Sequence, residues 1–168
     1  MHIQCTKKML DFLKPVITEK NTDFDIYAWH ANYITIMRKK FIVLMNDLTR
    51  FCIVLYGLKK SDFKDAKILL QKAIIVTMHF EEFDEALIMK YIKGMDDITY
   101  NKTKDRKLVS QINRAMQDAD WYAHDCLYGQ IFQPEISQLL NSGPVGTNNW
   151  KEVHYPKKKM LEYLKLLD

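Results

Sequence analysis

Three short apolar runs separated by two polar breaks constrain this chain more than any other feature of its sequence. The runs cover residues 33–37, 41–46 and 50–57 and are rich in Ile, Val, Tyr, Phe and Thr. Each run is too short for a typical helix, and its composition favours a strand. The breaks are short, and short connections join antiparallel neighbours because a parallel pair needs a long crossover. The sequence therefore predicts a three-stranded antiparallel meander over residues 33–57.

The two inner runs of this meander predict a sheet that is covered on both faces. FIVLM and FCIVLY are apolar at successive positions instead of alternate ones, which is typical of strands buried on both sides. Two amphipathic segments, residues 62–80 and 105–127, have the periodicity of covering helices. The charged side chains of the meander then gather at the ends of its strands, where we expect any working surface.

The remaining segments predict an α+β fold, with an antiparallel sheet of about four to five strands and helices on both faces. Further short strands are expected over residues 2–5 and 97–101, the second at a sheet edge. Further helices are expected between capping residues, prolines and glycines, over residues 6–15, 84–93, 134–140 and from 156 onward. The composition of residues 141–150 is typical of turns.

The length and composition suit a single domain over residues 1–168. A chain of 168 residues with only 5 Gly and 4 Pro has no room for long flexible linkers. Regular periodicity declines after Gly129, so residues 130–168 are expected to form a peripheral C-terminal extension of the same domain.

A cytoplasmic location without membrane contact is expected. The longest apolar runs fall short of the roughly 20 residues that cross a bilayer, and the N-terminus lacks the apolar region of a signal peptide. The three cysteines have no disulfide-framework spacing. No nucleotide-binding motif occurs, and the pairs His2/Cys5 and His124/Cys126 supply too few ligands for a zinc site. We therefore expect no cofactor and no metal.

His30 and Asp47 are the candidate catalytic residues. His30 stands between Trp29 and Asn32 at the entrance to the meander, and an imidazole can exchange a proton near neutral pH. Asp47 lies in the second break, close in sequence to Arg50. A structural interpretation stays open for both, because a histidine can be hydrogen-bonded into a sheet and Asp favours turns.

Cationic side chains at the strand ends and before the long helix are candidate ligands for nucleic-acid phosphates or other anions. A helix start with free amides, a hydroxyl and several cations is suited to binding phosphate, although a solvated helix end has the same composition. The net charge of +4 permits an acidic partner without requiring one. The residues in this set are Arg38, Lys39, Arg50, Thr103, Lys104 and Arg106.

Three segments resemble a known family. They read HIQCTKKMLD, WHANYITIMRKKFIVLMNDLTRFCIVLYGLK and TKDRKLVSQIN, and together they span residues 2–113. They are similar to a family of small bacterial proteins catalogued as domain of unknown function 6933, a resemblance that implies no activity, cofactor or substrate. It implies a position-by-position match at Trp29, His30, Asn32, Arg38, Asn46, Asp47, Arg50, Thr103, Arg106 and Asn113. The tail after residue 129 lies outside the resemblance.

Two main hypotheses for function follow. The first is a nucleic-acid-associated module that binds RNA or DNA through the basic ends of the sheet, with His30 serving a ribonuclease-like activity. The second is a protein-interaction module without catalysis, which meets a protein partner or a second copy of itself through Trp121, Tyr122, Tyr128 and Phe132. A small-molecule enzyme is a third possibility and requires a pocket that contains His30 with Asp47 or Arg50. The spatial arrangement of these residues distinguishes the hypotheses.

Overall fold

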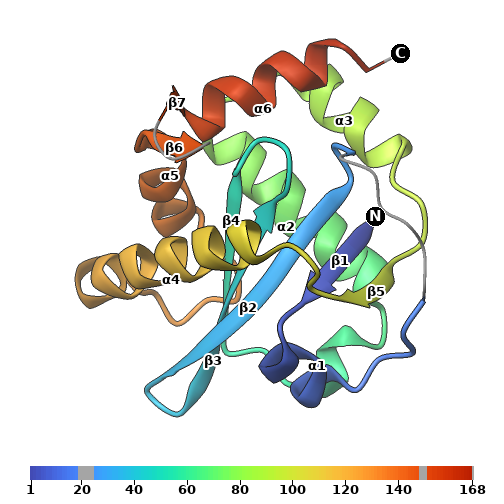
Figure 1. Ribbon diagram of the computed structural model, residues 1–168, viewed down its shortest axis with the longest axis vertical. Helices are drawn as coiled ribbons and strands as arrows, with labels where there is room; N and C mark the ends of the chain where they lie inside the picture. The colour runs from blue at the N-terminus through green and yellow to red at the C-terminus, as the bar shows by residue number, and fades with distance from the viewer. Residues whose placement is uncertain (19–24, 148–150, 168) are drawn as a thin grey trace.

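The structure, a computed structural model, describes residues 1–18, 25–147 and 151–167 and contains a five-stranded sheet between layers of helices (Figure 1). The strand order is β4-β3-β2-β1-β5. The strands are β1 (His2–Cys5), β2 (Ala28–Ile36), β3 (Lys39–Asn46), β4 (Cys52–Tyr56) and β5 (Thr99–Lys102). The α+β class is confirmed.

The sheet is mixed, so the expectation of a purely antiparallel sheet is wrong. The meander of β2, β3 and β4 is antiparallel, but β1 pairs in parallel with both β2 and β5. Helix α1 (Lys7–Leu13) and a long connection separate β1 from β2, and this separation is long enough for the crossover that parallel strands need. The short breaks inside the meander carried no information about this part of the sheet.

Strand β2 begins five residues earlier than the apolar run that predicted it. Its register places Trp29 opposite Asn46 and His30 opposite Met45. The segment WHAN contains two polar residues and therefore looked like the entrance to a strand. Because β3 continues to Asn46, this segment is paired on both sides, and His30 lies within the sheet.

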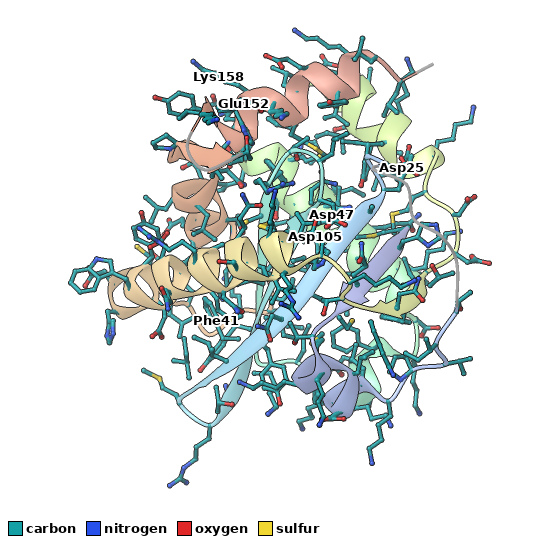
Figure 2. All side chains as sticks on the ribbon, in the orientation of Figure 1. Asp25, Phe41, Asp47, Asp105, Glu152 and Lys158 are labelled. Atoms are coloured by element: carbon teal, nitrogen blue, oxygen red, sulfur yellow. The ribbon has the colours of Figure 1, made fainter. Side chains whose placement is uncertain are left out.

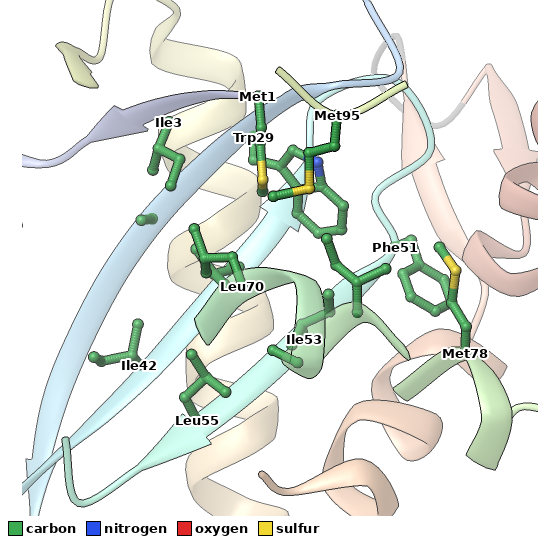
Figure 3. Close-up of a cluster of buried hydrophobic side chains, with 14 of the residues drawn as sticks. Met1, Ile3, Trp29, Ile42, Phe51, Ile53, Leu55, Leu70, Met78 and Met95 are labelled. Carbon is green, nitrogen blue, oxygen red and sulfur yellow. The ribbon is translucent and has the colours of Figure 1, made fainter. Parts of the chain in front are cut away.

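Helices cover both faces of the sheet, as the apolar inner strands predict. In Figure 1, α4 lies in front of the sheet and α2 behind it. Phe41, Val43 and Val54 pack with α4 on one face, while Trp29, Ile42 and Ile53 face α2 in the cluster that Figure 3 shows. The helices are η1 (Lys60–Phe63, a 3-10 turn), α2 (Ala66–Phe80), α3 (Glu85–Lys93), α4 (Arg106–Cys126), α5 (Pro134–Ser142) and α6 (Pro156–Lys165).

Helix α5 closes the outer edge of β4. The side chain of Asn141 accepts from the Cys52 amide and donates to the Cys52 carbonyl, and the Ser137 hydroxyl accepts from the Val54 amide. An edge strand presents unpaired amides and carbonyls that proteins often cover. Part of the extension that we expected to be peripheral therefore supplies buried groups to the main sheet.

The segment with turn composition, residues 141–150, contains one strand of a small second sheet, and the other strand follows it. Strands β6 (Val145–Thr147) and β7 (Glu152–His154) pair antiparallel, and residues 148–150 lie outside the described part of the chain. Among the described residues, no helix has the length and apolar character that spanning a membrane requires.

Buried Glu81 makes stability depend on pH in a way that a substitution can test. Burial raises the pKa of its carboxyl, against the opposing effects of Asn141, which donates to it, and of Lys157 at 3.3 Å. The folded state thus holds the proton more tightly than the unfolded chain, so this stabilisation is complete in acid and lost as pH rises through the raised pKa. We expect Glu81→Gln to remove this dependence in urea denaturation across a pH series. The exposed Glu82→Gln is the control, and parallel pH profiles for wild type and Glu81→Gln would contradict the expectation.

Candidate functional site

A row of buried polar side chains crosses the α4-facing side of the sheet. The parallel register aligns Gln4 of β1 with His30 of β2 and with Asn101 of β5. All three are less than a tenth exposed, whereas the same face of β3 and β4 carries apolar side chains. Buried polar groups are costly unless they find partners, so the partners of this row define the first part of the site.

His30 and Asp47 form a buried hydrogen-bonded pair. The Nδ1 atom of His30 lies 2.6 Å from Oδ1 of Asp47, and Oδ2 of Asp47 accepts from Nε2 of Gln4 at 2.8 Å. Because an ionised carboxylate only accepts hydrogen bonds, Nδ1 is the donor in the contact with Asp47. Nε2 of His30 is buried and has no partner among the described residues.

This pair has the arrangement of an acid/base dyad but lies in the protein interior. A carboxylate that fixes the imidazole tautomer is a recurring feature of catalytic sites. His30 is 0% and Asp47 2% exposed, and neither is among the residues that line the pocket between α4 and residues 143–146. The catalytic role of both residues stays a prediction, and α4 covers the face on which they lie.

Asn46 organises the turn that carries Asp47 and Arg50. Its Oδ1 accepts from the amides of Leu48 and Thr49, and its Nδ2 donates to the carbonyl of Ile26 at 2.7 Å. This pattern is the turn chemistry expected of Asn, here with additional bonds across the sheet. The turn holds Arg50 at φ 64°, a left-handed conformation that is uncommon outside glycine.

Arg50 lies under α4 and lines a pocket of about 500 Å³. Its Nε donates to Oε1 of Gln111 at 2.5 Å, and Nη1 is buried without a partner among the described residues. Burial lowers the pKa of the guanidinium, and the carboxylates of Asp47 and Asp105 partly oppose this effect. Figure 2 shows both aspartates near the start of α4. Asp47 therefore acts on Arg50 through space, with no hydrogen bond between them among the described contacts.

A second polar connection joins α4 to the sheet. The hydroxyl of Thr6 donates to Oδ1 of Asn32 at 2.8 Å, and Nδ2 of Asn32 donates to Oδ1 of Asn113 at 2.9 Å. Both asparagines belong to the segments on which the family resemblance rests. Their contact fixes the position of α4 over β2, so a structural role accounts for them.

Arg38 and Lys39 lie at the opposite end of the sheet from Arg50. Arg38 lies in the turn between β2 and β3, and Lys39 is the first residue of β3. Strand β3 has eight residues, which separates its two ends by roughly 25 Å at the usual strand rise. Exposed cations from other segments lie at this same end, which we name the cationic end. It comprises Lys7, Lys8, Lys14, Arg38, Lys39, Lys40, Lys59, Lys60, Lys64, Lys102 and Lys104.

Aromatic rings connect the segments of the cationic end. The Phe12 ring of α1 lies 5.5 Å from the Tyr33 ring of β2 and 6.2 Å from the Phe63 ring of η1. The ammonium groups of Lys8 and Lys40 lie 4.5 and 4.2 Å from the centre of the Tyr33 ring. A surface pocket joins α1 to β5 through its lining residues Lys7, Lys14, Lys102 and Thr103. The cationic end is therefore one continuous surface.

The predicted site residues occupy three places instead of one concave surface. His30 and Asp47 lie in the core, and Arg50 lies in the pocket under α4. Arg38, Lys39, Thr103, Lys104 and Arg106 belong to or border the cationic end, Arg106 from the exposed first turn of α4. Among the described residues, no three His, Cys, Asp or Glu side chains gather as metal ligands.

Sequence reasoning missed Gln4, Gln111 and the lysines of α1. Gln4 and Gln111 carry no motif, and only the parallel register and the packing of α4 bring them to His30 and Arg50. The pairs KK at 7–8 and 59–60 each follow a strand. The position of each pair after a strand can be read from the sequence. It indicates that the two pairs share a surface only when β1 is known to run parallel to β2.

Comparisons with known proteins give one match. A family model described as a domain of unknown function (DUF6933) matches residues 2–159. This range extends the resemblance seen in the sequence to include α5 and the beginning of α6. No curated protein and no solved structure matches the chain.

Proposed function

Since this chain belongs to the family described as a domain of unknown function (DUF6933), its own surface must indicate its role, and we propose that it is a nucleic-acid-binding module. In this proposal the cationic end contacts the phosphate backbone of RNA or DNA. Phosphate contacts supply most of the sequence-independent affinity of such proteins.

The observation that carries this proposal is the separation of charge over the surface. Eleven Lys and Arg side chains and the four carboxylates of Asp11, Asp62, Asp65 and Asp105 give the segments of the cationic end a formal charge of +7. The whole chain carries +4, so the rest of the molecule is net negative. A surface of one sign attracts a polyanion and orients its approach.

Several features of the cationic end favour a phosphate backbone as its partner. The cations come from α1, the β2–β3 turn, the β4–η1 segment and the β5–α4 connection, so they spread over a surface and suit an extended ligand. None of them appears in the ion pairs formed among the described residues. Their charge is therefore available to phosphates.

A more specific version of this proposal adds a ribonuclease-like activity that uses His30. His30 is buried, so RNA would reach its Nε2 only if α4 moved away from the sheet. A cleavage assay with labelled RNA, comparing wild type with His30→Asn, tests this form separately from binding.

Fluorescence anisotropy with labelled oligonucleotides over a salt series tests the binding proposal. We expect affinity for single-stranded RNA or DNA to fall steeply as salt rises. With about five phosphate contacts, the slope of log K against log salt is roughly −3.5 for a single strand. Absent or salt-independent affinity for single strands and duplexes alike would refute the proposal.

One observation favours a protein-interaction module as the second candidate function. Near the end of α4, Trp121 is 75% exposed and Tyr128 is 54% exposed, and such rings are common in protein interfaces. Sedimentation at high protein concentration tests for self-association. If Trp121→Ala leaves the molecular mass unchanged and wild type is monomeric, a second copy is not the partner.

A further inference from the structure

We propose that the pocket beside Arg50 binds a small molecule that carries a carboxylate or phosphate group on an apolar body. The pocket lies between α4, residues 143–146 and the adjoining ends of β3 and β4. Its volume of about 500 Å³ is within the range of sites that hold small ligands. This site is separate from the cationic end, and the proposal does not rest on nucleic-acid binding.

The Arg50 guanidinium has donor capacity that the protein does not use. Its Nε is bonded to Gln111, but Nη1 is buried without a hydrogen-bond partner among the described residues. A buried donor without an acceptor is unfavourable, and a planar guanidinium matches the oxygens of a carboxylate or phosphate. Because Arg50 lines the pocket, an anionic group bound there would lie against the guanidinium that carries this unsatisfied donor.

The surrounding protein holds the guanidinium in place before any ligand binds. The amide of Arg50 donates to the carbonyl of Asn46 at 2.9 Å, and the residue is fixed in the left-handed region at φ 64°. Gln111 is itself held, because its Nε2 donates to the carbonyl of Gly146 at 3.2 Å. Residues in such backbone conformations are common at ligand-binding sites, and a prearranged donor loses less freedom on binding.

The remaining wall of the pocket determines the body of the ligand. Met45, Leu139, Leu140 and Val145 supply apolar surface, which favours an aliphatic or aromatic group. The only carboxylate among the described lining residues is that of Asp118, which already lies 3.4 Å from Arg114. Asp47 and Asp105 act on Arg50 through space, so they weaken its attraction for an anion without occupying its donors.

Ligand-observed and protein-observed NMR titrations test this proposal with defined probes. Benzoate and phenyl phosphate each carry one of the two candidate head groups on an apolar ring. Inorganic phosphate supplies a head group without the ring, and phenol supplies the ring without an anionic head group. We expect at least one of the two combined probes to shift the resonances of Arg50, Gln111 and Gly146. The better of the two identifies the head group, and each half alone should bind at least about tenfold more weakly.

Two variants that act differently distinguish this site from general anion binding. Arg50→Lys keeps the charge but loses the planar fork, so we expect at least about a tenfold loss of affinity. Ser110→Trp changes an exposed lining residue of α4 and should block the pocket while leaving Arg50 intact. Lys72→Gln, which neutralises an exposed cation of α2 outside the pocket lining, is the matched control and should bind like wild type.

Probe binding by these variants can either support or overturn the proposed site. Loss of probe binding in Ser110→Trp, with the Arg50 Nε resonance unchanged in the free protein, supports the site even if Arg50→Lys is poorly folded. Probe-induced shifts confined to the cationic end, equal binding by Ser110→Trp, or no binding by either combined probe would each overturn the proposal.

Discussion

Replacement of His30 by alanine is expected to destabilise the protein by about 3–5 kcal/mol. The substitution leaves the Asp47 carboxylate buried, with Gln4 as its one remaining side-chain donor among the described residues. Removing one partner of a buried pair is costly because the other loses its compensation. Urea denaturation of wild type and variant measures the loss. His30→Asn places an amide donor near the position of Nδ1 and should recover part of the stability.

The exposed His124 on α4 provides a matched control for this prediction. His124→Ala removes the same side chain from the surface and should change stability by no more than about 0.5 kcal/mol. A loss below about 1 kcal/mol for His30→Ala would mean that the pair contributes little to the fold. In that case the structural interpretation of the pair would lose its support, and the catalytic interpretation would be favoured.

The meander was predictable because its information is local. The runs around residues 41–46 and 50–57 carry strand composition, and their short connections fix antiparallel pairing. Continuous apolar sequence also predicted the cover on both faces, which α2 and α4 provide. The caps of α3 and α4 at Asp84 and Asp105 are local features as well, and both accept from helix amides as expected.

The direction of β1 was not predictable because it depends on contacts distant in sequence. Residues 2–5 suggested only a strand, and their alignment with β2 and β5 arises from packing of the whole sheet. This alignment puts Gln4 beside His30 and brings the lysines of α1 near the β2–β3 turn. The sequence therefore predicted the individual candidate residues, but it did not predict that they lie in three separate places.

Arg50 shows the same limit at the level of one residue. Its sequence position in the turn after β3 suggested a rim cation beside Asp47. The bonds made by Asn46 fix the backbone of this turn, and they direct the side chain beneath α4 to Gln111. Those bonds depend on the geometry of the turn, which residue type alone does not specify.

Reversal of three charges on the cationic end is expected to lower nucleic-acid affinity by roughly 100-fold or more. The variant combines Lys7→Glu, Arg38→Glu and Lys60→Glu, which come from three different segments and are all exposed. Each lost contact between unit charges is worth about 1 kcal/mol in water, so three contacts correspond to that factor. Fluorescence anisotropy at fixed low salt measures the loss.

The salt dependence separates loss of phosphate contacts from a general effect of net charge. Removing three contacts should reduce the steepness of log K against log salt by about 2 for a single strand. The control variant Lys72→Glu, Lys93→Glu and Lys165→Glu makes the same change in net charge at exposed positions outside the cationic end. It should retain most of the slope, because long-range repulsion is screened at physiological salt. Equal losses of affinity and slope in both variants would mean that the polyanion does not recognise the surface formed by α1, the β2–β3 turn and η1.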